Sequence, residues 1–407
     1  MDDWFDLEVD RRNSLLLALQ AAAIFLAGRV LMIPAFLAAW RQQGPNRSSY
    51  PTGPPDFLTF LSLSWAGHWY HLIALQGYPS TLPLDPQTGA VVQNQWAFYP
   101  LYPSLVRVVM WLGPPYQTAS VLVSLTMGVA AMVVLAFLVR DAAAEAVARR
   151  PGLPLLAVAA LSAFPSGAVA VVGYSETTAL LLIVTALALI HHRQYLWAVA
   201  PVLLLGFARG VALPMLAVVI WHGICRYRGK GGVPQIVTRS DRIKLPALAL
   251  IALLSGVAWP AIAGWVTREP NAYLRTDAAW RVNAETARPF ISVVTKLSQW
   301  TGSAAWMLLA LVVVGLIALS LSRPAWALGP ELQAWGASYL VYIAAVADLG
   351  SPIFRFALLS ITLPLGLVAW SRKRWVQLLM IGLLLALQVV WIVHIWVFSG
   401  RGDAFPP

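Results

Sequence analysis

Long apolar stretches separated by short polar segments run through most of this chain. Each stretch is long enough for a helix that crosses a hydrocarbon core of about 30 Å while its backbone groups hydrogen-bond internally. The clearest are Ser14–Trp40, Thr118–Val139, Leu245–Trp265, Ala304–Leu321 and Leu378–Phe398. The period-two alternation of a closed barrel is absent. The pattern predicts an all-α, polytopic transmembrane helical protein, with residues 1–407 in a single domain.

The positions of the basic residues predict how the spans are oriented. Arg226–Lys244 and Arg372–Arg374 are rich in Arg and Lys, which is typical of cytoplasmic loops. Counting outward from these two loops gives about 11 spans and a cytoplasmic N-terminus. The first apolar stretch is much longer than that of a signal peptide, so we interpret it as a retained anchor.

The same count places three polar segments on the extracytoplasmic side. They are a long first loop, about residues 40–112, followed by Val266–Ser303 and Asp348–Arg355. Within the first loop, Pro100–Trp111 is expected to form a helix at the membrane boundary. The candidate chemistry described below collects mainly in these three segments.

One apolar stretch is predicted to be broken. Tyr195–Cys225 is too long for a single span at about 1.5 Å per residue, and Arg209 and Gly210 interrupt it. We expect two short helices that meet near the outer face, and this is the only break that the sequence makes visible.

Composition excludes an ordinary soluble domain. Hydrophobic residues make up 59% of the chain, charged residues 11%, and the mean hydropathy is +0.71. The net charge of +11 does not indicate nucleic-acid binding, because the basic residues lie at span ends and in loops, where membrane orientation and contact with membrane lipids explain them. The single cysteine, Cys225, excludes an internal disulfide and a cysteine metal cluster.

The first loop contains a dense motif of aromatic residues, glycine and proline. Its residues are Trp65, Trp69, Tyr70, Ile73, Ala74, Gly77 and Tyr78, and then Phe98, Tyr99, Pro100, Leu101, Tyr102 and Pro103. This motif resembles the first-loop signature of the GPI mannosyltransferase II-like family and its bacterial relatives, within the GT-C superfamily of membrane glycosyltransferases.

The resemblance implies a function. Family members transfer a sugar with inversion, at the extracytoplasmic face, from a polyprenyl-phosphate donor. For this chain it implies a mannosyltransferase acting on a glycolipid or another cell-envelope glycan acceptor, with no soluble cofactor. The sequence shows no nucleotide-binding fingerprint and no zinc spacing.

The family's first-loop aspartate corresponds to Ala66, which can neither accept a proton nor bind a metal. Three explanations stay open. The sequence carries an engineered Asp-to-Ala change, or His68 has taken over as the base, or the chain is a natural pseudoenzyme. An imidazole with an ordinary pKa near about 6.5 suits a base. His68 and His71 lack a matched carboxylate, so we assign no metal site.

Glu176 is the strongest remaining carboxylate. Tyr174, Ser175 and Glu176 resemble a Tyr-Ser-Glu segment of the family, which implies a catalytic role for Glu176 and substrate contact for Tyr174. Ser175 or Glu176 equally suits the first turn of a helix, through capping and the helix dipole.

Two groups of side chains are candidates for holding the substrate. Arginine in apolar surroundings tends to face an interior partner, which makes Arg107, Arg209 and Arg355 candidates for the lipid phosphate, with snorkelling to the interface as the alternative. The candidates for gripping or covering the sugar are Trp65, Trp69, Tyr70, Tyr99, Tyr102, Trp280 and Arg281. Interfacial aromatic belts are the alternative for the tryptophans and tyrosines.

A rival function comes from another class. The chain could be a transporter of lipid-linked sugars or a non-catalytic partner of an enzyme that uses them. Transporters commonly carry broken helices in corresponding halves, whereas only the break at Arg209 is visible here.

Overall fold

The computed structural model describes residues 2–43, 55–229, 237–281, 289–320, 327–346 and 352–397. All regular elements in these ranges are helices, and the one β-interaction is an isolated bridge between Leu84 and Val91. The elements are α1 (Asp2–Arg41), α2 (Phe57–Leu63), α3 (Ala66–Gln76), η1 (Gln95–Ala97), α4 (Leu101–Met110), α5 (Tyr116–Ala142), α6 (Ala144–Arg149), α7 (Leu153–Ala163), η2 (Pro165–Val171), α8 (Glu176–His191), α9 (Tyr195–Ala208), α10 (Leu213–Arg228), α11 (Arg239–Thr267), α12 (Ala272–Ala278), α13 (Ile291–Thr301), η4 (Gly302–Ala304), α14 (Ala305–Ser320), α16 (Pro330–Val346), α17 (Pro352–Leu358), α18 (Thr362–Ala369) and α19 (Arg374–Trp396). The all-α prediction is confirmed for this part of the chain.

Five segments of the described chain are long and apolar enough to cross a membrane. They are Arg12–Arg41, Tyr116–Ala142, Arg239–Thr267, Ile291–Gly315 and Arg374–Trp396. Each contains most of one stretch expected from sequence, so the coarse prediction of a multi-pass membrane protein is supported. The fourth begins at Ile291, inside a segment that we expected in an outer loop. The count of about 11 spans stays a prediction.

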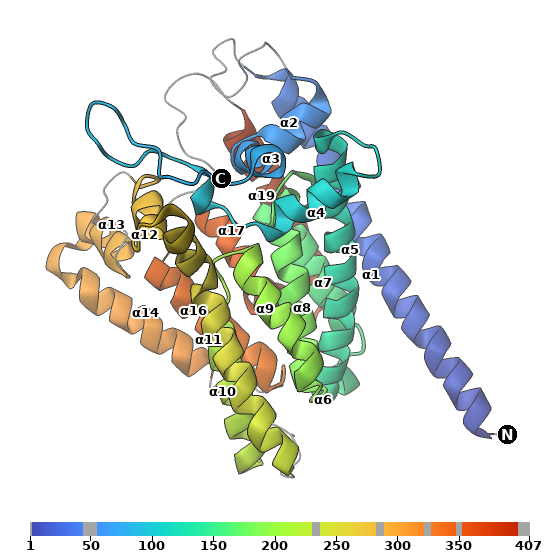
Figure 1. The fold of residues 1–407 in the computed structure, drawn as a ribbon. Coiled ribbons are helices and arrows are strands. Elements are labelled where there is room, and N and C mark those ends of the chain that lie inside the picture. Colours follow the sequence, from blue (N-terminus) through green and yellow to red (C-terminus); the bar gives the residue numbers. More distant parts are fainter. Residues whose placement is uncertain are drawn as a thin grey trace.

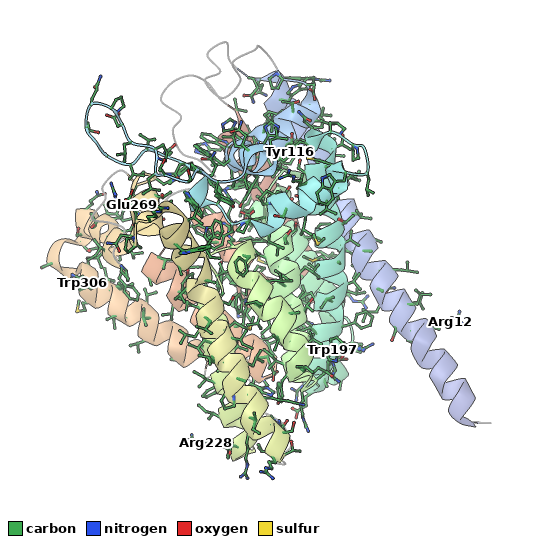
Figure 2. All side chains as sticks on the ribbon, in the orientation of Figure 1. Arg12, Tyr116, Trp197, Arg228, Glu269 and Trp306 are labelled. Carbon is green, nitrogen blue, oxygen red and sulfur yellow. The ribbon has the colours of Figure 1, made fainter. Side chains whose placement is uncertain are left out.

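The polar segments gather at the two ends of a helical bundle. Figure 1 shows α2, α3, α4 and α12 at the upper end, while α6 and the protruding tips of α10 and α11 lie at the lower end. With side chains drawn, Tyr116 marks the upper end and Arg228 the lower one (Figure 2). The first-loop helices α2, α3 and α4 and the basic last turn of α10 therefore lie at opposite ends.

The broken stretch after Tyr195 is confirmed. α9 ends at Ala208 and α10 begins at Leu213, so Arg209 and Gly210 lie between two helices. α9 also packs very closely on α11, because a Cβ on Gly206 would lie 2.1 Å from the carbonyl oxygen of Ser255. The small residue is required at this crossing.

The expectation of a single break is wrong. α7 and η2 meet at an angle of 83°, which makes a second broken segment at Phe164. Pro165 starts η2 and removes a backbone donor, so a straight helix cannot continue there. The bend exposes backbone carbonyls inside the bundle, and these need partners.

Side chains from other helices supply those partners. The buried Arg29 of α1 donates hydrogen bonds to the carbonyl oxygens of Ser162 and Gly167. Gln388 of α19 donates to Ser162 at 3.3 Å and to Phe164 at 2.5 Å. The bend is therefore held by polar groups from the first and last described helices, and it leads directly into the candidate site.

Candidate functional site

α8 begins at Glu176, after a loop that turns back from η2. Ser175 is the N-cap residue, but its side chain makes no capping hydrogen bond. Its hydroxyl lies 2.7 Å from that of Tyr70 and 3.3 Å from Nη1 of Arg209. The Ser175 side chain therefore does not cap the helix, and its hydroxyl instead joins α3 to the α9–α10 break.

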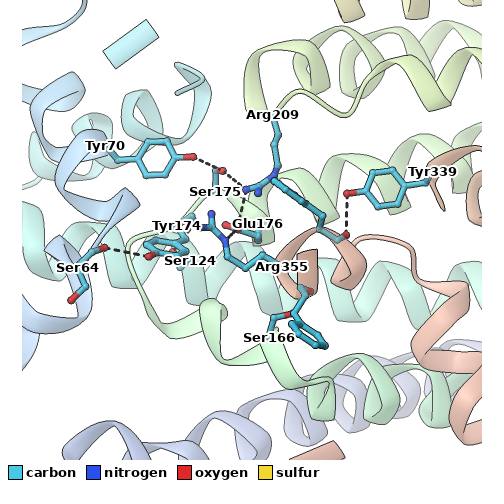
Figure 3. Close-up of polar contacts among 12 residues, drawn as sticks. Ser64, Tyr70, Ser124, Ser166, Tyr174, Ser175, Glu176, Arg209, Tyr339 and Arg355 are labelled. Atoms are coloured by element: carbon cyan, nitrogen blue, oxygen red, sulfur yellow. Dashed lines mark hydrogen bonds and ion pairs between the residues drawn. The ribbon is translucent and has the colours of Figure 1, made fainter. Parts of the chain in front are cut away.

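Glu176 lies between two arginines (Figure 3). Its carboxylate oxygen Oε1 is 2.5 Å from Nε of Arg355 and 2.9 Å from Nη1 of Arg209. The Glu176 side chain is fully buried, and those of Arg355 and Arg209 are only 10% and 11% exposed. A buried carboxylate is stable as an anion only with such partners. The cluster carries one more positive than negative charge, and it joins α8, α17 and the α9–α10 break.

Arg209 owes its position to the break that precedes α10. Its backbone is extended, with φ −168° and ψ 159°, where α9 has ended and α10 has not yet begun. Tyr342 donates a hydrogen bond to the carbonyl oxygen of Gly210. A Cβ on Gly210 would lie 2.8 Å from the Tyr99 hydroxyl, so only glycine fits here without displacing that tyrosine.

Aromatic rings complete the surroundings of both guanidinium groups. The Arg355 guanidinium carbon lies 4.4 Å from the centre of the Tyr174 ring, and that of Arg209 lies 5.0 Å from the Phe356 ring. The Tyr174 hydroxyl donates to the carbonyl oxygen of Ser64 at 3.3 Å, which anchors the site to the turn before α3. Cation–π contacts of this kind favour arginine over a neutral residue.

Two further hydroxyls hold the backbone beside Arg355 in place (Figure 3). Ser166 of η2 donates to the carbonyl oxygen of Phe354 at 2.6 Å, and Tyr339 of α16 donates to that of Phe356 at 3.0 Å. The position of Arg355 is therefore coupled to the α7–η2 bend.

Position 66 faces the same region. Ala66 and Tyr70 are one turn apart on α3 and both are buried, so they share the face that Tyr70 turns toward Ser175. Trp65, just before the helix, has φ +53°, which is a rare conformation for a residue with a large side chain. Such backbone is retained where the surroundings enforce it. Here α3 is pressed against α2, since a Cβ on Gly67 would lie 2.0 Å from the Ser62 carbonyl oxygen.

A polar cavity of about 90 Å³ opens beside Arg209. Tyr99, Tyr273 and Tyr342 line it, and the hydroxyls of Tyr99 and Tyr273 are 3.1 Å apart. Burial raises the pKa of Tyr273 to about 12, so at neutral pH its hydroxyl is protonated and can donate a hydrogen bond. Arg209 thus has Glu176 on one side and a cavity lined by neutral donors on the other.

The aromatic residues of the first loop pack on one another. The rings of Trp69 and Phe98 stack with centres 5.9 Å apart, and the Trp280 ring lies edge-on to both, 5.3 Å from each. Trp280 therefore contacts the first loop. One face of Trp69 is covered by Phe98, so a sugar could stack only on the other.

Three other sequence candidates have different surroundings. Arg107 is exposed on α4. Arg281 is bound by Asp277 at 2.9 Å and donates to the carbonyl oxygen of Val346 at 3.1 Å. Tyr102 packs against Tyr70, but its buried hydroxyl donates to the Ser120 carbonyl oxygen at 2.9 Å. Arg107 is thus placed at the surface, Arg281 is held by Asp277 and Val346, and the Tyr102 hydroxyl is engaged by the backbone of α5.

His68 is exposed beside Trp69, with ring centres 5.6 Å apart. Partial burial lowers its pKa, so the imidazole is neutral at pH 7 and able to accept a proton. The neighbouring His71 packs its ring against Tyr116. Within the described ranges, no three His, Cys, Asp or Glu side chains are grouped so that they could hold a metal ion.

Sequence reasoning missed Tyr273, Tyr339 and Tyr342. Tyr339 and Tyr342 are three residues apart in an apolar stretch, and this pair of hydroxyls among apolar residues is a signal that could have been used. Asp348, in the third segment expected outside, lies beyond the described residues. No protein-family model matches this chain, and no curated protein matches it significantly.

Proposed function

We propose that this chain is a multi-pass membrane glycosyltransferase that moves a sugar, in our reading mannose, from a polyprenyl-phosphate donor to a glycolipid or another cell-envelope glycan. The observation that carries the proposal is the position of Arg209. It lies at a helix break beneath the first-loop motif, between the buried Glu176 and a cavity lined by tyrosine hydroxyls.

The chemistry needs a cation where the phosphate departs. In the proposed reaction an acceptor hydroxyl attacks the anomeric carbon from the side opposite the phosphate, the bond to the phosphate oxygen breaks, and the configuration inverts. Negative charge then grows on the departing phosphate. Arg209 is fixed by Glu176 and Ser175 before the reaction begins, and such preorganised donors stabilise developing charge without reorganisation.

Glu176 is better suited to holding the arginines than to accepting the proton. Two guanidinium groups bind its Oε1, which stabilises the ionised carboxylate. Its Oε2 is buried and has no hydrogen-bond partner among the described residues, which leaves one acceptor for a substrate hydroxyl. We assign it a positioning role toward Arg209 and Arg355.

The acceptor proton then requires another base. An aspartate at position 66 would lie on the α3 face that carries Tyr70, which fits the role of the family acid. With Ala66 in place, His68 is the nearest group in sequence that can accept a proton. If His68 is the base, the proposal makes this chain active as it stands. If the base must be an acid at position 66, only the Ala66→Asp variant is active.

We further propose that the upper end in Figure 1 is extracytoplasmic, with a cytoplasmic N-terminus and about 11 spans. The basic tips of α10 and α11 lie at the other end, which the positive-inside rule favours for the cytoplasm. The first loop and Arg209 then face the side on which polyprenyl-linked sugars are used by the family.

The alternative is a transporter or non-catalytic partner that binds lipid-linked sugars. The second broken segment, α7–η2, and Ala66 favour it. Yet both breaks fall between Leu153 and Arg228, in neighbouring helices, rather than in corresponding halves of the chain. Enzymatic transfer therefore remains the function that we propose.

The test is transfer from radiolabelled polyprenyl-phosphate mannose into lipid or polymer by the purified chain in membranes. Transfer only by Ala66→Asp identifies an enzyme whose base is missing, and transfer by both chains that is lost in His68→Gln identifies His68 as the base. Arg209→Gln should abolish transfer, while Arg107→Gln, the same change on an exposed part of α4, should not. Transfer by neither chain, or full activity of Arg209→Gln, would overturn the proposal.

A further inference from the structure

A second cavity, of about 360 Å³, lies at the opposite end of the molecule from the Glu176 cluster. It is formed mainly by the last turns of α10 and the first turns of α11, the two helices whose tips protrude at the lower end of Figure 1. Its walls are mostly apolar, and Ile220, Ile224 and Leu245 belong to them. None of the residues assigned above to the glycosyltransferase site contributes to it.

The cavity faces outward. Ile220 is 50% exposed and Tyr227 is 63% exposed, so these walls are uncovered in the described part of the chain. Gly223 leaves room between the helices, because a Cβ there would meet only the Leu245 side chain, at an ordinary contact distance of 3.9 Å. One of the two helices that form these apolar walls, α11, belongs to a candidate membrane span.

The rim of the cavity is positively charged. Arg228 ends α10 and Arg242 lies in the first turn of α11; both line the cavity, both are exposed, and neither makes an ion pair with a described residue. The acid among the lining residues, Asp241, is bound by Arg226 at 3.1 Å and completes the helix cap with Thr238. Its negative charge is therefore already balanced from within the protein.

We propose that this cavity binds an anionic phospholipid. The phosphate lies between Arg228 and Arg242, whose guanidinium groups match phosphate geometry, and an acyl chain lies along Ile220, Ile224 and Leu245. A zwitterionic phospholipid shares the acyl chains but lacks the net charge, so it is bound less well. This site is independent of sugar transfer and does not rest on the proposed function.

The purified, delipidated chain in detergent can be titrated with phosphatidylglycerol or phosphatidylcholine, and bound lipid counted by native mass spectrometry. We expect one phosphatidylglycerol to bind in preference to phosphatidylcholine. At about 1 kcal/mol for each arginine near the headgroup, the Arg228→Gln, Arg242→Gln double variant should bind about 30-fold more weakly. Gly223→Leu, which fills the cavity, should remove the bound lipid.

Matched controls separate this site from general surface charge. Arg12→Gln combined with Arg374→Gln removes two exposed arginines elsewhere, and Gly382→Leu makes the same glycine change on an exposed face of α19, where a Cβ meets nothing within 4 Å. Both should bind phosphatidylglycerol as the unchanged chain does.

Equal binding of the two phospholipids, or unchanged binding by the double arginine variant, would overturn the proposal. Tighter binding of a polyprenyl phosphate that Gly223→Leu abolishes would also overturn it, by giving the cavity a different occupant. The double arginine variant decides the question if Gly223→Leu does not fold.

Discussion

Replacing Glu176 by Gln should cost more stability than any surface change, because it leaves two buried guanidinium groups without their shared carboxylate. A guanidinium–carboxylate contact at about 4 Å and an effective dielectric constant of about 20 contributes about 4 kcal/mol. Glu176 makes two such contacts, to Arg209 and Arg355. The new amide keeps a hydrogen-bond acceptor, so the net loss should approach the value of about 3–5 kcal/mol that is typical of breaking a buried ion pair.

Thermal unfolding in detergent measures this loss. At about 2 °C for each kcal/mol in a large domain, the midpoint of Glu176→Gln should fall by about 6–10 °C. Glu145→Gln, the same change at an exposed position of α6, should alter stability by less than about 0.5 kcal/mol. If both variants have the same unfolding midpoint as the unchanged chain, the carboxylate does not hold the arginines and the reasoning fails.

A double-variant cycle adds a sharper test of the same contact. Glu176→Gln combined with Arg209→Gln removes one charge of each sign, so the pair should be less destabilised than the sum of the single changes, by about 0.5–3 kcal/mol. Strict additivity would mean that the two side chains are not coupled.

Three further predictions concern the supports of the site. Gly67→Ala should destabilise the chain by about 1–3 kcal/mol, because its Cβ would meet backbone at 2.0 Å, whereas Gly315→Ala, which meets nothing within 4 Å, should be neutral or stabilising. Arg29→Leu should cost about 1–3 kcal/mol, because it removes donors to the carbonyls of the α7–η2 bend. Burial lowers the pKa of His68 and of His71, so stability should fall as the pH drops below about 6.5, where the unfolded chain takes up protons first.

Each of these has a direct measurement. Paired thermal melts compare the two glycine variants, and equal midpoints would contradict the close approach at α3. Limited proteolysis should cut Arg29→Leu faster near the bend, and an unchanged rate would contradict its role there. Midpoints measured from pH 8 to pH 5 should slope less in the His68→Gln, His71→Gln double variant; an unchanged slope would assign the titration to other groups.

The long helices were predictable because their signal is local. A run of about 20 apolar residues must satisfy its backbone inside a membrane as a helix, whatever its neighbours are. The break at Arg209 was also predictable, since the stretch is too long for one span and glycine follows the arginine. The α7–η2 bend was missed although Pro165 marks it. The residues around Pro165 are almost uniformly apolar, so no alternation of polar and apolar positions indicates where the helix changes direction.

By itself, the sequence determined the apolar helices, the first-loop motif and the short set of residues worth testing, because these depend on composition and on neighbours along the chain. Only the tertiary structure decided that Glu176 meets Arg355, 179 residues away, and that Arg209 also borders a cavity with Tyr273 and Tyr342. It likewise placed Arg107 on an exposed face of α4 and paired Arg281 with Asp277. The physical reason is that an apolar helix can present any face to its neighbours, and only the packing of all the helices fixes which polar side chains meet.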